Sequence, residues 1–271
     1  MDRKANGSPS RNIIAAAVIA AAAGGAGFMI GKQDVPNPAP INEIEVSPPE
    51  APVPTVADVA LERGDIIRLA NEAADAASGG PAVQDPLEGR RFILRIPFGC
   101  FGPTSDSAAQ NANYTVEDQV LRVRVLAQDW TALPWIANET SQPDVVAAEG
   151  FWIPRPWTRS EACPPGDGEP VADVSSIGIV QLFDSDSSRI GQRRGRALEA
   201  TMPIDVGNAG VVKGLKLVLS GRVAPWPGTR ETVRCNAAKA FERPVCLVGA
   251  KLDSISIENI ESGEQLADWS F

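Results

Sequence analysis

The chain has 271 residues, of which 44% are hydrophobic and 22% are charged, a composition that supports a folded core. Its formal net charge is -9, whereas a nucleic-acid-binding protein carries a basic face, so we expect no nucleic-acid partner. The chain contains no histidine, which excludes Ser-His-Asp and Cys-His catalysis and His-based zinc sites.

The N-terminus carries Arg3, Lys4 and Arg11 ahead of an uncharged run, Ile13–Ile30. At 1.5 Å per residue this run spans roughly 27 Å, which is enough for the hydrocarbon core of a bilayer. It is also longer than the h-region of a signal peptide, about 7–15 residues. We therefore predict a cytoplasmic basic segment (1–12) and a transmembrane signal anchor (13–31), with a signal peptide cleaved near Gly24 as the alternative.

Either interpretation exports the rest of the chain. We predict a single-pass protein of the inner (cell) membrane that contacts the lipid bilayer through residues 13–31, with a periplasmic or extracellular C-terminal domain. Ala23, Gly27 and Gly31 recur at every fourth position, as in close helix–helix contacts. A homodimer through this helix is one interpretation. Chance is the other, and it is favoured because most residues of the run are small.

Residues 32–56 are rich in proline and have few large apolar side chains, so we predict an extended acidic linker here. The acidity is concentrated in residues 33–89, which carry eleven acidic residues and two arginines. Apolar residues then recur at helical spacing over Val56–Ser78, which predicts one short amphipathic helix within a helix-and-connector region, 57–89. Thr55 is the expected N-cap, and this helix packs either on the following domain or on another copy.

From residue 90 the hydrophobic period changes to two, which is typical of strands with one buried face. The chain is therefore predicted to be mainly β, with residues 90–271 forming an antiparallel β-sandwich or barrel-like domain. The expected strands and apolar runs are Arg91–Phe98, Leu121–Val125, Val174–Phe183, Leu215–Val223, Val245–Ala250, Ser254–Glu258 and Gln265–Phe271.

All four cysteines lie in this β domain: Cys100, Cys163, Cys235 and Cys246. An even number of cysteines in an exported segment favours two disulfides, for which three pairings exist. We prefer Cys235–Cys246, because two short strands around residues 236–244 would bring them together, and Cys100–Cys163 follows by elimination. A zinc site is disfavoured because there is neither a Cys-x-x-Cys pair nor a histidine.

Two segments supply candidate ligand contacts. Trp152 and Trp157 lie in a proline-interrupted stretch, Phe151–Trp157, which we expect in a loop or at a sheet edge. These rings either stack on a sugar or peptide or, as we favour, plug the ends of the core. Three arginines, Arg193, Arg194 and Arg196, either bind an anionic partner or, as is more common, are solvated or paired with neighbouring Asp.

No phosphate-binding glycine loop and no Ser-x-x-Lys motif is present, so we expect no cofactor, no metal and no catalytic residue. The order of anchor, spacer and β domain favours a non-catalytic binding or scaffolding protein of the bacterial cell envelope. Its expected partner is cell-wall glycan or another envelope protein. The alternatives are a glycan hydrolase that uses two carboxylates, and a secretion or pilus assembly component.

Overall fold

The computed structural model describes residues 59–81, 87–104, 111–131, 133–140, 145–166, 175–186, 192–204, 214–239 and 241–271, all within one compact unit, Pro52–Phe271. The predicted basic N-terminus, signal anchor and linker lie outside the described residues. Within the described ranges, no helix is both long and apolar enough to cross a bilayer. The structure therefore bears on the predicted helix and the predicted β domain.

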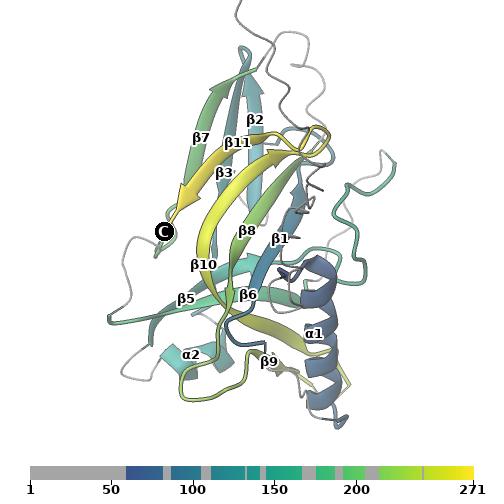
Figure 1. Ribbon diagram of the computed structural model, residues 1–271, viewed down its shortest axis with the longest axis vertical. Coiled ribbons are helices and arrows are strands. Elements are labelled where there is room, and N and C mark those ends of the chain that lie inside the picture. Colours follow the sequence, from purple (N-terminus) through teal and green to yellow (C-terminus); the bar gives the residue numbers. More distant parts are fainter. Residues whose placement is uncertain are drawn as a thin grey trace, which may run out of the picture. The chain divides into compact units, whose positions relative to one another are not determined.

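The described part of the chain is mainly β, as predicted (Figure 1). Four expected strands, Arg91–Phe98, Leu121–Val125, Leu215–Val223 and Gln265–Phe271, are present within one residue of their predicted bounds. The elements in chain order are α1 (Arg63–Ala77), β1 (Arg91–Phe98), β2 (Ala112–Glu117), β3 (Val120–Val125), β4 (Gln128–Asp129), α2 (Pro134–Thr140), β5 (Val145–Trp152), β6 (Ile177–Asp184), β7 (Leu198–Pro203), β8 (Leu215–Val223), β9 (Val233–Asn236), β10 (Val245–Asn259) and β11 (Gln265–Ser270).

The long strand β10 joins the two halves of an eight-stranded sheet (Figure 1). Its first part pairs with β9 on one edge and with β6 on the other, while the part from Ala250 to Asn259 pairs with β8 and β11. The strand order is β1-β8-β10-β6-β5-β4. The prediction of two separate strands in this region was wrong, because one continuous strand serves both halves of the sheet.

The expectation of an antiparallel domain holds in part. The other strand pairs of the described residues are antiparallel, but β10 pairs with β6 in parallel over Cys246–Gly249. Residues Cys246–Ala250 are all buried, with apolar side chains packed on both faces of this half of the sheet. Burial on both faces is the usual setting of parallel pairs. Alternation of side chains predicts which face of a strand is buried, but it carries no information about strand direction.

A separate three-stranded sheet, β2-β3-β7, completes the β structure. Its inward residues, among them Tyr114, Leu121 and Val123, join one large cluster with inward residues of β1, β8 and β10, which we call the main core. At roughly 25 cal/mol per Å² of buried apolar surface, this shared cluster is the principal source of stability. The main core therefore holds the two sheets together.

A smaller apolar cluster covers the opposite face of β5 and β6, under α2, and we call it the tryptophan cluster. Trp130 and Trp226 are fully buried in it, and Trp135 and Trp152 pack against them. The Trp130 and Trp152 rings meet edge to face with centroids 5.2 Å apart. The packing of Trp152 in this cluster fits the expectation that its ring plugs the core.

Helix α1 is shorter than predicted, because residues 59–62 are not helical. Leu61 instead forms a parallel bridge to Phe92, with its N–H 2.8 Å from the Arg91 carbonyl oxygen. Glu62 is the N-cap and forms a reciprocal capping box with Asp65. The predicted cap, Thr55, lies outside the described residues. The apolar face of α1 packs on its own domain, mainly on β9 and β10.

Candidate binding groove between α1 and β9

The two tryptophans singled out from the sequence have different surroundings. Trp152 is half-buried at the end of β5, and the side-chain amide of Asn111 bonds both its carbonyl oxygen (2.8 Å) and its N–H (3.0 Å). Trp157 is 68% exposed, in the turn that follows. The core-plugging interpretation therefore holds for Trp152 and is wrong for Trp157.

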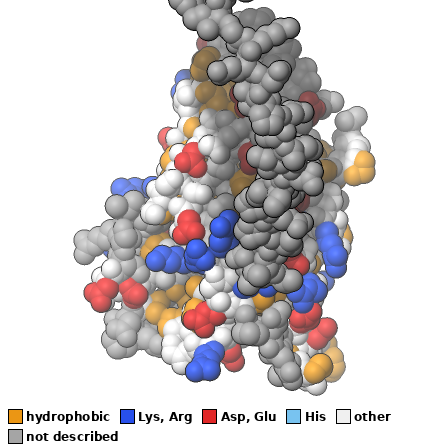
Figure 2. All heavy atoms as spheres, in the orientation of Figure 1, with side chains coloured by type: hydrophobic (Ala, Val, Ile, Leu, Met, Phe, Trp, Pro, Cys, Tyr) orange, Lys and Arg blue, Asp and Glu red, His pale blue; other side chains and the backbone are white. Residues whose placement is uncertain are grey.

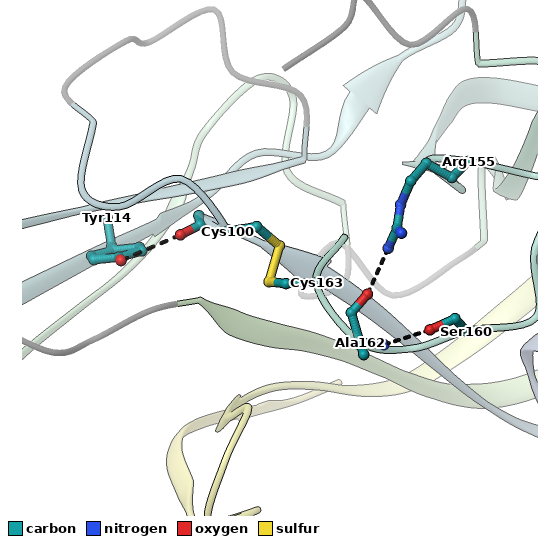
Figure 3. Close-up of a disulfide and its surroundings, with 7 residues drawn as sticks. Cys100, Tyr114, Arg155, Ser160, Ala162 and Cys163 are labelled. Atoms are coloured by element: carbon teal, nitrogen blue, oxygen red, sulfur yellow. Dashed lines mark hydrogen bonds between the residues drawn. A yellow bond between two sulfur atoms is a disulfide. The ribbon is translucent and has the colours of Figure 1, made fainter. Parts of the chain in front are cut away.

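Two sets of arginine hydrogen bonds and one disulfide hold the turn that carries Trp157. The Arg63 guanidinium of α1 donates to the carbonyl oxygens of Pro154, Arg155 and Thr158. Arg155, at a left-handed φ of 49°, donates to the Ala162 carbonyl oxygen at 2.7 Å (Figure 3). The adjacent Cys100–Cys163 disulfide links this segment to the end of β1 (Figure 3). The exposed Trp157 side chain therefore lies on a turn that these bonds fix in place.

The segment that carries the three arginines, Arg193–Arg196, which we call the arginine segment, binds a buried carboxylate through its backbone. The backbone N–H groups of Arg193 and Arg194 donate to Glu149 Oε2 and Oε1 at 2.7 and 2.6 Å, and Glu149 is only 6% exposed. Burial lowers the pKa of the Arg193 guanidinium, the nearby Arg196 charge lowers it further, and Glu149 opposes both effects. Glu149 is thus held by backbone donors that the sequence does not reveal. The ion pairing expected of the arginine side chains is not found among the described residues.

The candidate contacts do not form one joint site. Glu149 and Phe151 face the main core, whereas Trp152 lies one residue out of phase with them and packs on the tryptophan cluster. Successive side chains of a strand point to opposite faces. The arginine segment and Trp152 are therefore attached to opposite faces of β5.

A groove of about 750 Å³ lies between α1 and β9. We call it the α1–β9 groove. One wall is a stripe on α1, at helical spacing, formed by Leu69, Ala73, Ala76 and Ala77. The other wall is Trp135 of α2, and the floor is β9 with the turn before it. Because three of the four α1 residues are alanine, the helix wall leaves room for side chains of a ligand.

One edge of β9, which has no strand partner among the described residues, faces this groove. The Cys246 N–H donates to the Ser176 carbonyl oxygen, away from β9, so Cys235 and Cys246 form a pair without mutual hydrogen bonds in the β9–β10 ladder. By the same alternation, the backbone groups of Val233 and Cys235 point away from β10. Among the described residues, no group donates to or accepts from them. The edge thus offers two N–H donors and two carbonyl acceptors.

The edge lies between the two walls of the groove. The side chains of Val233 and Cys235 pack with the main core, on the same side as α1. The intervening Arg234 has its guanidinium over the Trp226 ring, 5.0 Å from the centroid, on the side of α2. A strand added to β9 would therefore direct alternate side chains toward α1 and toward Trp135.

The charged groups that line the groove are two arginines and one glutamate. Glu231 lies 3.4 Å from the Arg234 guanidinium, which leaves Arg230 as an exposed cation with no ion-pair partner among the described residues.

Two bonds hold the groove in shape. The Cys235–Cys246 disulfide links β9 to β10, and Arg243 donates to Asn71 Oδ1 of α1 at 2.7 Å.

A second, polar hollow of about 570 Å³ lies at the N-terminal end of α1. It contains three carboxylates, of which Glu62 and Asp65 form the helix cap. Burial raises the pKa of Glu161, an effect opposed by Arg95 and Lys216. Only Glu161 is thus free of a capping role in this hollow.

Both predicted disulfides are formed with the preferred connectivity, and no free cysteine remains. The zinc alternative is thereby excluded for these thiols. In the described ranges no three His, Cys, Asp or Glu residues come close enough to hold a metal ion.

Among the described residues visible in Figure 2, basic and acidic side chains are interspersed. The α1–β9 groove was not predicted from the sequence. Its only signal in the sequence was the apolar stripe of the helix, which included Ala73, because an unpaired strand edge is a property of the assembled sheet. The chain matches no protein-family model, no curated protein and no solved structure, so the groove is interpreted from its own geometry.

Proposed function

We propose that this chain is a non-catalytic binding protein of the cell envelope whose binding surface is the α1–β9 groove. The observation that carries the proposal is the open edge of β9 between an apolar helix wall and Trp135. Exposed edges of this kind bind additional chains unless they are covered or blocked by charge. Here the two residues whose backbone groups face outward are Val233 and Cys235, and neither carries a charged side chain.

The proposed location is extracytoplasmic. Residues 13–31 anchor the chain in the inner membrane, the proline-rich acidic linker (32–56) spaces it from the bilayer, and a sandwich-like β domain is displayed beyond. Two disulfides support this location, because such bonds persist in oxidising compartments and are rare in the bacterial cytosol. The missing histidine supports a non-catalytic role.

The location is tested with alkaline phosphatase fused after Phe271, since this reporter folds only outside the cytosol. The full chain is expected to give high activity, and a chain lacking residues 13–30 is expected to give none. Equal activity of the two fusions, or four reduced thiols in the native protein, would overturn the proposed location.

The binding surface is tested with a photo-crosslinking amino acid placed at Ala76 in the groove. The matched control carries it at Thr201, an exposed position on β7 outside the groove. In living cells we expect a defined adduct from position 76, its loss when Ala73→Glu is added, and no adduct from position 201. Adducts of equal yield from both positions would contradict a specific groove.

Glycan hydrolysis is a second candidate, favoured by one observation: the raised pKa of Glu161, as expected of a general acid, in a hollow that also contains Glu62. The assay is release of reducing ends from cell-wall glycan fragments, with Glu161→Gln as the diagnostic variant. Release by the native chain that is lost in the variant would establish hydrolysis. No release by the native chain would exclude it.

A further inference from the structure

We infer that the α1–β9 groove takes an extended, acidic polypeptide segment, which joins β9 as an additional strand. This inference rests on the proposed function and adds the chemistry of the ligand. It is carried by the backbone groups of the edge, the two walls and the exposed guanidinium of Arg230.

The edge selects an extended backbone. The outward donors and acceptors belong to Val233 and Cys235, which are two residues apart in a strand. Such groups alternate along the edge at about 6.6–6.8 Å per pair of residues, the repeat of another strand. An added strand would form up to four hydrogen bonds here, as in peptide recognition by β-augmentation. Oligosaccharide hydroxyl groups have no matching repeat of donor and acceptor.

The walls select side chains of two kinds. A ligand residue that points toward α1 meets Leu69, Ala73 and Ala76, an apolar surface that an aliphatic side chain would cover. Its neighbours point toward Trp135 and the side of β9 that carries Arg234. The ligand is therefore expected to alternate apolar with polar residues.

The charge selects acidic residues near the beginning of β9. Arg230 is exposed there without an ion-pair partner among the described residues, whereas the single lining carboxylate, Glu231, is paired with Arg234. A carboxylate on the ligand would complement Arg230, whereas an ammonium group would be repelled by it. The net charge of the groove lining is positive although the whole chain is acidic.

The test uses two synthetic octapeptides that alternate valine with threonine. One carries two glutamates at an end and the other carries two lysines there. Binding to the whole chain in detergent is measured by fluorescence anisotropy. We expect the acidic peptide to bind about 3- to 10-fold more tightly at low salt, and the preference to shrink at 0.5 M salt. Arg230→Glu should reverse the preference, and Lys251→Glu, at an exposed position outside the groove, should leave it unchanged.

A second variant tests the added strand. Val233→Pro removes an outward N–H at the first residue of an edge strand, where proline is tolerated, and leaves the β9–β10 ladder bonds of Arg234 and Asn236 in place. We expect near-native circular dichroism and at least about tenfold weaker peptide binding. Methylation of every second backbone nitrogen of the acidic peptide removes the N–H donors along one edge of the added strand. Methylation of the set that faces β9 should abolish binding, whereas methylation of the other set should not.

The outcomes separate the inference from the proposed function. Equal affinity for both peptides would overturn the acidic preference, and native affinity in Val233→Pro would overturn strand addition. Binding of chitohexaose in the groove, with no binding of either peptide, would overturn the inference and leave a binding function. No binding of any probe, together with no adduct from position 76, would overturn the proposed function as well.

Discussion

The buried guanidinium of Arg63 donates from Nε to the Thr158 carbonyl oxygen at 3.2 Å, across 95 positions of sequence. The first turn of α1 is thus bonded directly to the turn that presents Trp157. The same guanidinium also donates to the carbonyl oxygens of Pro154 and Arg155. Arg63 is only 1% exposed, so these bonds are shielded from water and the turn depends on them.

Replacing Arg63 with methionine should destabilise the domain by about 2–4 kcal/mol, because it leaves buried carbonyl oxygens without donors. Urea unfolding followed by tryptophan fluorescence measures the change. Arg68→Met is the matched control: its guanidinium is exposed and pairs with Glu72 one turn away, so its loss should cost less than about 0.5 kcal/mol. Equal losses in the two variants would contradict the bracing role of Arg63.

Gly178→Ala should destabilise the domain by about 1–3 kcal/mol through overpacking. A Cβ at this position would lie 2.8 Å from Leu247 Cδ2 and 2.9 Å from Trp130 Cη2, inside the tryptophan cluster. Gly64→Ala gives the opposite expectation, because its Cβ would meet only the flexible Arg159 side chain and alanine favours a helix by about 0.5–1 kcal/mol. Thermal unfolding of both variants checks the predicted difference in sign.

The two disulfides should differ in their contribution to stability. Cys100–Cys163 closes a separation of 63 residues and Cys235–Cys246 one of 11. Loop-closure entropy predicts losses of about 4 and about 3 kcal/mol when each pair is replaced by alanine. Equilibrium unfolding of the two double variants tests this order. The shorter bridge should matter more for peptide binding, because it holds β9; equal binding by both variants would refute that role.

Glu161→Gln should stabilise the domain near neutral pH. Burial raises the pKa of Glu161 above its ordinary value of 4.5, and Glu62 adds to the effect, whereas Arg95, Lys216 and Arg63 oppose it. Between the unfolded and folded pKa values the folded state binds more protons, so stability falls as the pH rises through this window. Denaturation as a function of pH should show the advantage of the variant shrinking as the pH falls from neutral toward about 4.5 and vanishing below that value. A constant difference would argue against the raised pKa.

The sequence alone was sufficient for the β character of the domain, for β1 and β8, and for both disulfides. These features depend on the local alternation of apolar and polar residues and on the number and spacing of the cysteines. Strand β5 escaped detection because Ala147, Ala148 and Gly150 are small and buried on both faces, so the strand shows no alternation. The end of α1 was predictable from Ser78 and the glycines after it, whereas its start depended on the bridge between Leu61 and Phe92.

Only the tertiary structure decided the parallel pairing of β6 with β10, the role of Glu149 as acceptor for the arginine segment, and the open edge of β9. The first two depend on partners far apart in the chain: Cys246 pairs with Ile177, and Glu149 lies 44 positions from Arg193. Local patterning specifies which side of a strand is apolar, because that is a property of the strand itself. An unpaired edge depends on what the rest of the chain places beside it, and residue types along a single strand do not record this.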